Sequence, residues 1–215
     1  MIAFKEHASS QFDAGLRELM KQLEAVKSHL HKFIALIIVS VEDGSDRTEE
    51  ARVIDKGVNE LEFAIDQNVM RLISKFSPMM EELRMVLAVV KIASACESAA
   101  DNLKNTVKRV GRLQGLKGLP QREPFLTMLD KVATQFDKVL DHFGELEDAD
   151  MKSILDEREA IHALYQHSIA SLPADDNTIG VSFLLRNIER VSELAYDIAK
   201  VGYAAKHNRK FVKPE

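Results

Sequence analysis

The chain has 215 residues, 46% of them hydrophobic and 29% charged, with a formal net charge of −5. This composition supplies enough apolar material for a core, and its acidic balance excludes the broad basic surface that binds nucleic acid. The single cysteine, Cys96, excludes an internal disulfide and is typical of a reducing compartment. Residues 1–10 show no secretory pattern, and the longest apolar run, 33–41, is too short to span a membrane. We therefore expect a soluble, cytoplasmic protein.

The first predicted element is a long helix. Apolar residues recur from Phe12 to Ile37 in alternating steps of four and three, which indicates a helix with one buried seam. Gly44 is predicted to end it in a left-handed conformation, and residues 45–48 to cap a second helix that runs to about residue 76.

A third helix is predicted to begin at Ser77 and Pro78, with the serine as its cap and the proline in its first turn. Its seam covers residues 86–110, and the glycine-containing segment 111–122 is expected to close it. Three glycines surround Lys117 in this segment, but the pattern is not that of a phosphate-binding loop and indicates a linker.

The carboxyl half repeats the scheme, with helices predicted at about 123–143, 150–172 and 176–206. At a spacing of 103 residues, the apolar positions Leu23, Leu30, Phe33 and Val58 match Leu126, Ala133, Phe136 and Ile161. This internal repeat predicts an all-α fold of two tandem three-helix bundles, with residues 1–112 and 123–215 joined by a linker at 113–122. We expect more than 70% helix, essentially no strand, and a core that includes Leu23, Leu30, Phe33, Val89, Cys96, Leu103, Ile188 and Ala195.

Two acidic stripes recur in the two halves. Glu97, Asp101 and Asn105 follow one another in four-residue steps and therefore share one helical face. A corresponding stripe, Glu189, Glu193 and Asp197, follows 92 residues later. Acids four residues apart repel each other, and a hard divalent cation is one means of offsetting that repulsion.

The middle helices supply the facing residues. In the first half these are Asp55, Asn59 and Glu62, whereas the second half has Arg158, His162 and Tyr165. The candidate metal ligands are therefore Asp55, Asn59, Glu97, Asp101, Glu189, Glu193 and Asp197, and Mg²⁺, Mn²⁺ or Fe would suit their oxygen atoms. If a cation binds anywhere, we expect it at the first half in preference to the second. The opposing outcome is an empty site in which a neighbouring cation such as Lys104 neutralises the acids.

Catalytic chemistry has little support. Glu159 and His162 have the Glu-x-x-His spacing of helical di-iron sites, but such sites need two of these motifs and only one is present. Cys96 lies on an apolar seam, and no local motif places a nucleophile beside a base. We assign no catalytic residue; a metal-dependent enzyme in a helical bundle and a coiled-coil scaffold are kept as alternatives.

Short motifs along most of the chain resemble the PhoU family of phosphate-signalling regulators. The matching runs are HASSQFDAGL at 7–16, VIDKGVNELE at 53–62, PMMEELR at 78–84, KIAS before Glu97 at 91–94, and RNIERVSE at 186–193. The sequence departs from the family's E-R-I-G-D signature, because Ser98, Ala99 and Ala100 follow Glu97, while Ser192 and Glu193 replace the second glycine and aspartate. The resemblance is thus to a divergent member.

The resemblance implies a non-enzymatic regulator that restrains the phosphate-starvation response. Such a regulator would contact the ATPase subunit of the phosphate ABC transporter and a sensor histidine kinase, as a homodimer, and family members bind metal through the signature acids. The basic tail, with Lys206, Arg209, Lys210 and Lys213, would either touch an anionic membrane surface or stabilise the carboxyl end of the last helix.

Overall fold

The fold was analysed in a computed structural model that describes residues 10–172, 174 and 177–213. These residues form six α-helices and no strand. The helices are α1 (Ser10–Asp43), α2 (Thr48–Phe76), α3 (Met80–Arg112), α4 (Arg122–His142), α5 (Asp148–Ala170) and α6 (Thr178–His207). They account for more than 70% of the chain, as predicted, and each begins and ends within about three residues of its predicted position. His7 and Asp176, which belong to the predicted motifs and helices, lie outside the described residues.

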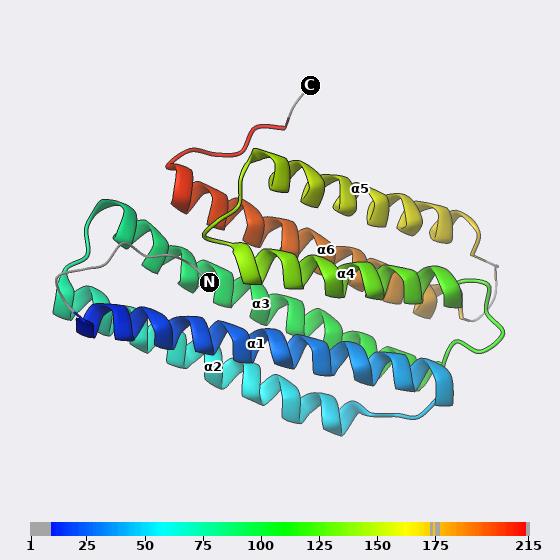
Figure 1. The fold of residues 1–215 in the computed structure, drawn as a ribbon. Helices are drawn as coiled ribbons and strands as arrows, with labels where there is room; N and C mark the ends of the chain where they lie inside the picture. The colour runs from blue at the N-terminus through cyan, green and yellow to red at the C-terminus, as the bar shows by residue number, and fades with distance from the viewer. Residues whose placement is uncertain (1–9, 173, 175–176, 214–215) are drawn as a thin grey trace.

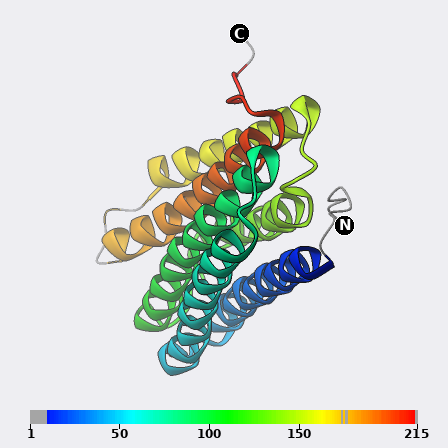
Figure 2. The same ribbon diagram turned by 90° about the vertical axis from the view of Figure 1, so that its left-hand side faces the viewer.

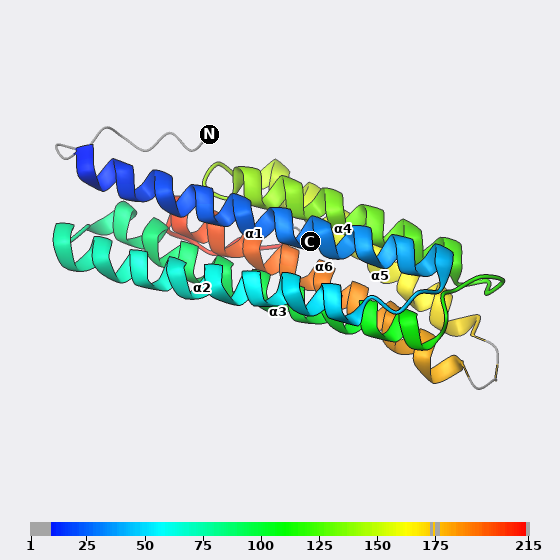
Figure 3. The same ribbon diagram turned by 90° about the horizontal axis from the view of Figure 1, so that it is seen from below.

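The helices form two groups of three that lie side by side along one long axis (Figure 1). Helices α1, α2 and α3 pack on one another, and so do α4, α5 and α6. The most extensive contact in the molecule joins the groups through α3 and α6, with a smaller one between α1 and α4 (Figure 2). Helices α2 and α5 are outermost, at the bottom and top of Figure 1, and touch only their own groups. Seen from below, the helices run along the same long axis (Figure 3). The predicted pair of three-helix bundles is therefore present, and its two members share one continuous core.

Every predicted core residue that was named is buried, including Phe33, Cys96 and Ile188. Two of the matched repeat positions are not: Leu126 and Ala133 are only partly buried. The buried face of α4 instead carries Phe125 and Val132, one position earlier in each case. Phe136 stays buried, so the buried face of α4 is turned by part of the roughly 100° that separates neighbouring residues, and α4 contacts α1 as well as α6.

The turns follow the predictions in one place and depart from them in another. Gly44 has φ +71° and ends α1 in the left-handed conformation, and its N–H donates to Ser40 O at 2.9 Å. Ser77 does not cap α3. It lies at φ +46° after α2, where its N–H donates to Ile73 O at 2.9 Å, and α3 begins three residues later at Met80. Ser77 adopts the left-handed conformation that closes α2, so it does not cap α3, and Pro78 lies outside both helices.

Polar contacts join the two groups as well as apolar ones. His31 contacts Asp137 at 2.6 Å and Lys27 contacts Asp141 at 2.5 Å, so both pairs tie α1 to α4. Within the second group, Ser192 Oγ donates to the buried amide oxygen of Gln135 at 2.8 Å. A buried polar pair that satisfies itself in this way favours one register of α6 on α4.

Candidate functional site

The first acidic stripe lies on α3 beside α2. Asp55, Glu97 and Asp101 are all half-buried, whereas Asn59 and Asn105 are exposed. The α-helical period explains this division, since Glu97 follows the buried seam residue Cys96 and Asp101 lies one turn further along the same face. The structure thus brings together the carboxylates of the predicted site and leaves its amides in solvent.

Lys104 occupies the space between these acids. Its Nζ lies 2.9 Å from Asp55 Oδ1 and 2.5 Å from Asp101 Oδ1, so one ammonium joins α2 to α3. Partial burial alone would lower the pKa of Lys104, but the hydrogen bonds to Asp101 and Asp55 outweigh it and the pKa is raised. The ammonium therefore stays charged and performs the neutralisation that a bound cation would otherwise supply.

The neutralisation is incomplete. Burial raises the pKa of Glu97, and the nearby charges of Asp101, Glu62 and Asp55 raise it further against the opposing charge of Lys104. Four carboxylates consequently face one ammonium. This excess of negative charge is the property of the first half that would attract a cation.

The second stripe is paired with cations along its whole length. Glu189 is only 3% exposed, and its carboxylate contacts His162 Nδ1 at 2.5 Å and the guanidinium of Arg186. Arg190 contacts Glu193 at 2.7 Å. A buried carboxylate needs such partners, because an unpaired charge in the interior is costly.

The remaining acids of the second half follow the same rule. Burial would raise the pKa of Glu193, but the hydrogen bond from Arg190 and the charges of Arg186 and Arg158 lower it. Asp197 pairs with Lys200 at 2.6 Å. Electrostatically this half offers little to a metal ion.

In both halves, cationic side chains are already paired with acids that were predicted to bind metal. In the described part of the chain, no group of three or more histidine, cysteine, aspartate or glutamate side chains is arranged to hold a metal ion. A cation at the first half would have to displace Lys104 from Asp55 and Asp101, and one at the second half would have to displace arginines. The metal-ligand assignment of Asp55, Asn59, Glu97, Asp101, Glu189, Glu193 and Asp197 stays a prediction, which Mn²⁺ titration can test.

The residues that raised the enzyme alternative are directed elsewhere. Glu159 does not share a centre with His162, because its carboxylate binds Lys213 at 2.5 Å while His162 binds Glu189. Cys96 is fully buried, and burial raises the pKa of its thiol to about 12. A thiol held protonated in an apolar core is a poor nucleophile.

Sequence reasoning named Lys104 as a neutralising residue but missed the arginines of α6. Arg186 and Arg190 each lie three residues before an acid of the stripe, and that spacing is readable as a helical ion pair. The contact between His162 and Glu189 joins two helices and has no local sequence pattern.

Together, the six-helix arrangement and the repeated acidic stripe define a helical protein built from two related three-helix bundles. A PhoU domain model matches residues 19–110 of the chain. The predicted resemblance to the PhoU family is thus confirmed, and the named relatives share about a quarter of their residues with this chain.

Curated relatives align with nearly the whole chain. It is 25% identical over 213 residues to the phosphate-specific transport system accessory protein PhoU of Escherichia coli K12, covering 93% of this chain and 86% of that protein. It is 26% identical over 209 residues to a homologue of that accessory protein from Rhizobium meliloti, covering 92% and 87%.

Solved structures agree in fold. The crystal structure of PhoU from Pseudomonas aeruginosa matches with a TM-score of 0.83 at 19% identity, over 92% of this chain and all of that one. The phosphate transport system regulatory protein PhoU from Streptococcus pneumoniae matches with a TM-score of 0.79 at 20% identity, over 94% and 100%.

No helix in the described part of the chain is long and apolar enough to cross a membrane.

Proposed function

We propose that this protein is a non-enzymatic accessory regulator of phosphate transport. The observation that carries the proposal is the agreement along almost the whole chain with proteins named as phosphate-specific transport accessory proteins, on the same two-bundle fold. The inert thiol of Cys96 and the separation of Glu159 from His162 support a role without a catalytic step.

The finer mechanism is part of the same proposal. In the cytoplasm, the protein contacts the ATPase subunit of the phosphate ABC transporter and a sensor histidine kinase, and it holds the phosphate-starvation response off while phosphate is plentiful. It does so as a homodimer. Long packed helices suit an interaction scaffold, because their surfaces present ordered side chains to a partner at little ordering cost.

Deletion of the gene tests the proposal directly. In cells grown in high phosphate, we expect expression of phosphate-starvation genes to rise on deletion and to return when the wild-type chain is supplied. The matched control is a Leu30→Asp chain, which buries an uncompensated charge in the core and should not restore repression. Unchanged expression on deletion would assign the protein to another pathway.

A further inference from the structure

A hollow of about 620 Å³ lies between the amino-terminal part of α3 and the carboxyl-terminal part of α6. Its floor is apolar and is formed by Leu87, Ala88, Val201, Ala204 and Phe211. Leu87 is 45% exposed, so part of this apolar floor faces solvent. The hollow is separate from the acidic stripe of the first half and touches the second stripe only at Asp197.

The rim of the hollow is cationic, although the chain as a whole is acidic. Arg84, Lys91, Lys200 and Lys210 line it together with one acid, Asp197. The lining therefore carries a formal charge of +3 on a protein whose net charge is −5. Fields of one sign concentrated around an apolar floor attract the opposite charge and give an interface its specificity.

Two of these cations have no polar partner in the part of the chain that the structure describes. Lys200 pairs with Asp197 at 2.6 Å, and Arg84 Nε donates to Ala205 O at 3.1 Å. Among the described residues, Lys91 and Lys210 make no hydrogen bond or ion pair. They can bind an external anion without breaking a contact to another described residue.

The cations stand on both sides of the floor. Helices α3 and α6 are antiparallel, since Arg84 meets Ala205 at one end and Thr106 meets Asn187 at 3.3 Å further along. Lys91 lies two helical turns from Arg84, about 10 Å along α3, and hence close to the level of Lys200 on α6. Each end of the hollow thus has a cation on the α3 side and another on the α6 or tail side.

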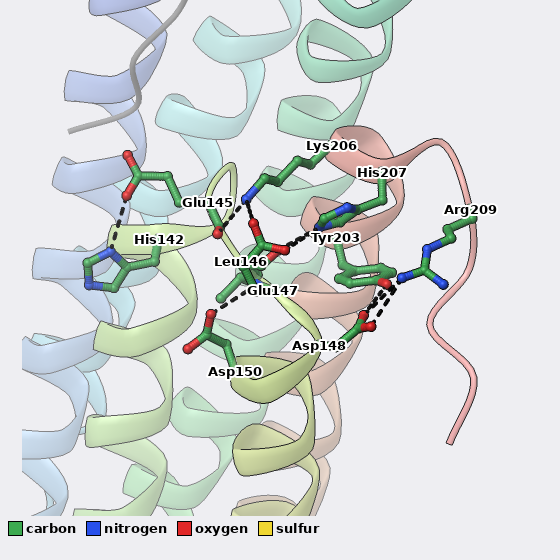
Figure 4. A network of polar contacts seen from close by, with 10 residues as sticks. All are labelled: His142, Glu145, Leu146, Glu147, Asp148, Asp150, Tyr203, Lys206, His207 and Arg209. Carbon is green, nitrogen blue, oxygen red and sulfur yellow. Dashed lines mark hydrogen bonds and ion pairs between the residues drawn. The ribbon is translucent and has the colours of Figure 1, made fainter. Parts of the chain in front are cut away.

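The segment after α6 forms one wall and is held in place by a polar network (Figure 4). Asp148 accepts hydrogen bonds from Tyr203 and from Arg209, and Lys206 donates to Glu145 O and to the Glu147 carboxylate.

The ring of Phe211 packs edge-on against Tyr203 at 5.6 Å, and Lys213 pairs with Glu159. Four tail cations were predicted either to touch a membrane or to stabilise the helix end. Three of them, Lys206, Arg209 and Lys213, form ion pairs with acids of α5 and the turn before it, and the fourth, Lys210, lines the hollow. The wall is preorganised, which lowers the ordering cost of binding.

We propose that this hollow binds an acidic amphipathic helix of a partner protein. An apolar stripe of the helix would rest on Leu87, Val201 and Phe211, while its flanking carboxylates would pair with the cations on either side. Helices α3 and α6 form the two sides of the hollow with the apolar floor between them. Grooves of this kind receive the apolar face of an amphipathic helix. A single-headed lipid would need cations at one end only, whereas here they stand at both ends and both edges.

The proposal rests on the proposed function in one respect only, that a regulator acting by contact requires a partner surface. Its test uses an 18-residue helical peptide with leucines at i, i+3 or i+4 and i+7 and glutamates on both flanks. Binding to the full chain is measured by calorimetry and by NMR shifts of residues around the hollow. We expect saturable binding that weakens as salt increases, with the NMR shifts grouped around Leu87 and Phe211.

Charge reversal provides the decisive comparison. Lys91→Glu/Lys210→Glu should weaken the glutamate-flanked peptide by about tenfold or more, and should favour a matched lysine-flanked peptide. Because neither lysine has a partner among the described residues, the variant should keep the wild-type melting temperature. Lys117→Glu, an exposed change in the connection between α3 and α4, is the matched control and should alter peptide affinity by less than about twofold.

Four results would overturn the proposal. They are an absence of peptide binding, equal binding of the two peptides, lysine-dependent binding to phosphatidylglycerol vesicles instead of to the peptide, and self-association that the double variant abolishes. None of them bears on the deletion experiment. If deletion releases the starvation genes while the Lys91→Glu/Lys210→Glu chain still represses them and binds no peptide, the hollow is excluded and the proposed function stands.

Discussion

Replacing Lys104 by methionine removes the ammonium that joins α2 to α3 while keeping a long unbranched side chain. The lysine, Asp55 and Asp101 side chains are 27%, 17% and 49% exposed, so both pairs lie between the surface and the interior. Exposed pairs contribute about 0.2–1 kcal/mol, and removing one partner of a buried pair costs about 3–5 kcal/mol. For the two half-buried contacts together, we expect a loss of about 1–2 kcal/mol at low ionic strength.

Thermal and urea unfolding would measure this loss. A chain of this size loses about 2–4 °C in Tm for each kcal/mol, so the Tm should fall by about 2–8 °C. The control is Lys56→Met, whose partner Glu60 lies 3.7 Å away with both side chains largely exposed, and it should change the Tm by less than about 1 °C. The loss should shrink as salt screens the acids.

Mn²⁺ adds a second readout for the same variant. Because the ammonium no longer lies between Asp55 and Asp101, Mn²⁺ should raise the Tm of Lys104→Met more than that of the wild type, and Glu97→Gln/Asp101→Asn should abolish the difference. Equal Tm values for wild type and Lys104→Met in low salt would refute the assigned role of Lys104. An equal response of all three chains to Mn²⁺ would remove the first-half site.

Three further predictions concern stability. Because Glu97 has a raised pKa in the folded state, its ionised form lowers the stability of the protein. Glu97→Gln should therefore stabilise the protein at pH 7 by a few tenths of a kcal/mol. Urea titrations should show this gain vanish below about pH 4, where the glutamate is protonated in both the folded and the unfolded state. Gly202→Ala should destabilise by about 1–3 kcal/mol, because a Cβ there would collide with the carbonyl oxygen of Phe143; a Tm equal to the wild type would show that α4 and α6 can separate freely. Leu30→Asp should abolish cooperative unfolding by circular dichroism, since Leu30 is 1% exposed and an unpaired carboxylate would be buried; a native melting curve would contradict the core assignment.

Patterns confined to one helix were readable from the sequence. The steps of three and four through Leu23, Leu30 and Phe33 predicted both the helix and its buried face, because helical geometry repeats every 3.6 residues. Gly44 was likewise predictable, since its left-handed conformation depends on its own missing Cβ. Ser77 was not: a serine before a proline satisfies the rules for a helix start, and only its left-handed backbone in the structure shows that it ends α2 instead.

In the acidic stripes too, contacts within one helix could be predicted and contacts between helices could not. The spacing of Glu97 and Asp101 established that they share a face, but the partner that reaches Asp55 comes from Lys104, 49 residues away on another helix. Similarly, the burial of Glu189 depends on His162 from α5.

By itself, the sequence determined the six helices, their apolar faces, the repeat and the resemblance to the PhoU family. Each of these depends on spacing within one segment or on the order of segments. The tertiary structure alone decided the rotation of α4, the pairing of each acid and the cationic hollow between α3 and α6. Arg84 and Ala205 are 121 residues apart, yet they border the same hollow. Side-chain packing sets how two helices are rotated and aligned against each other, and no spacing within either helix contains that information.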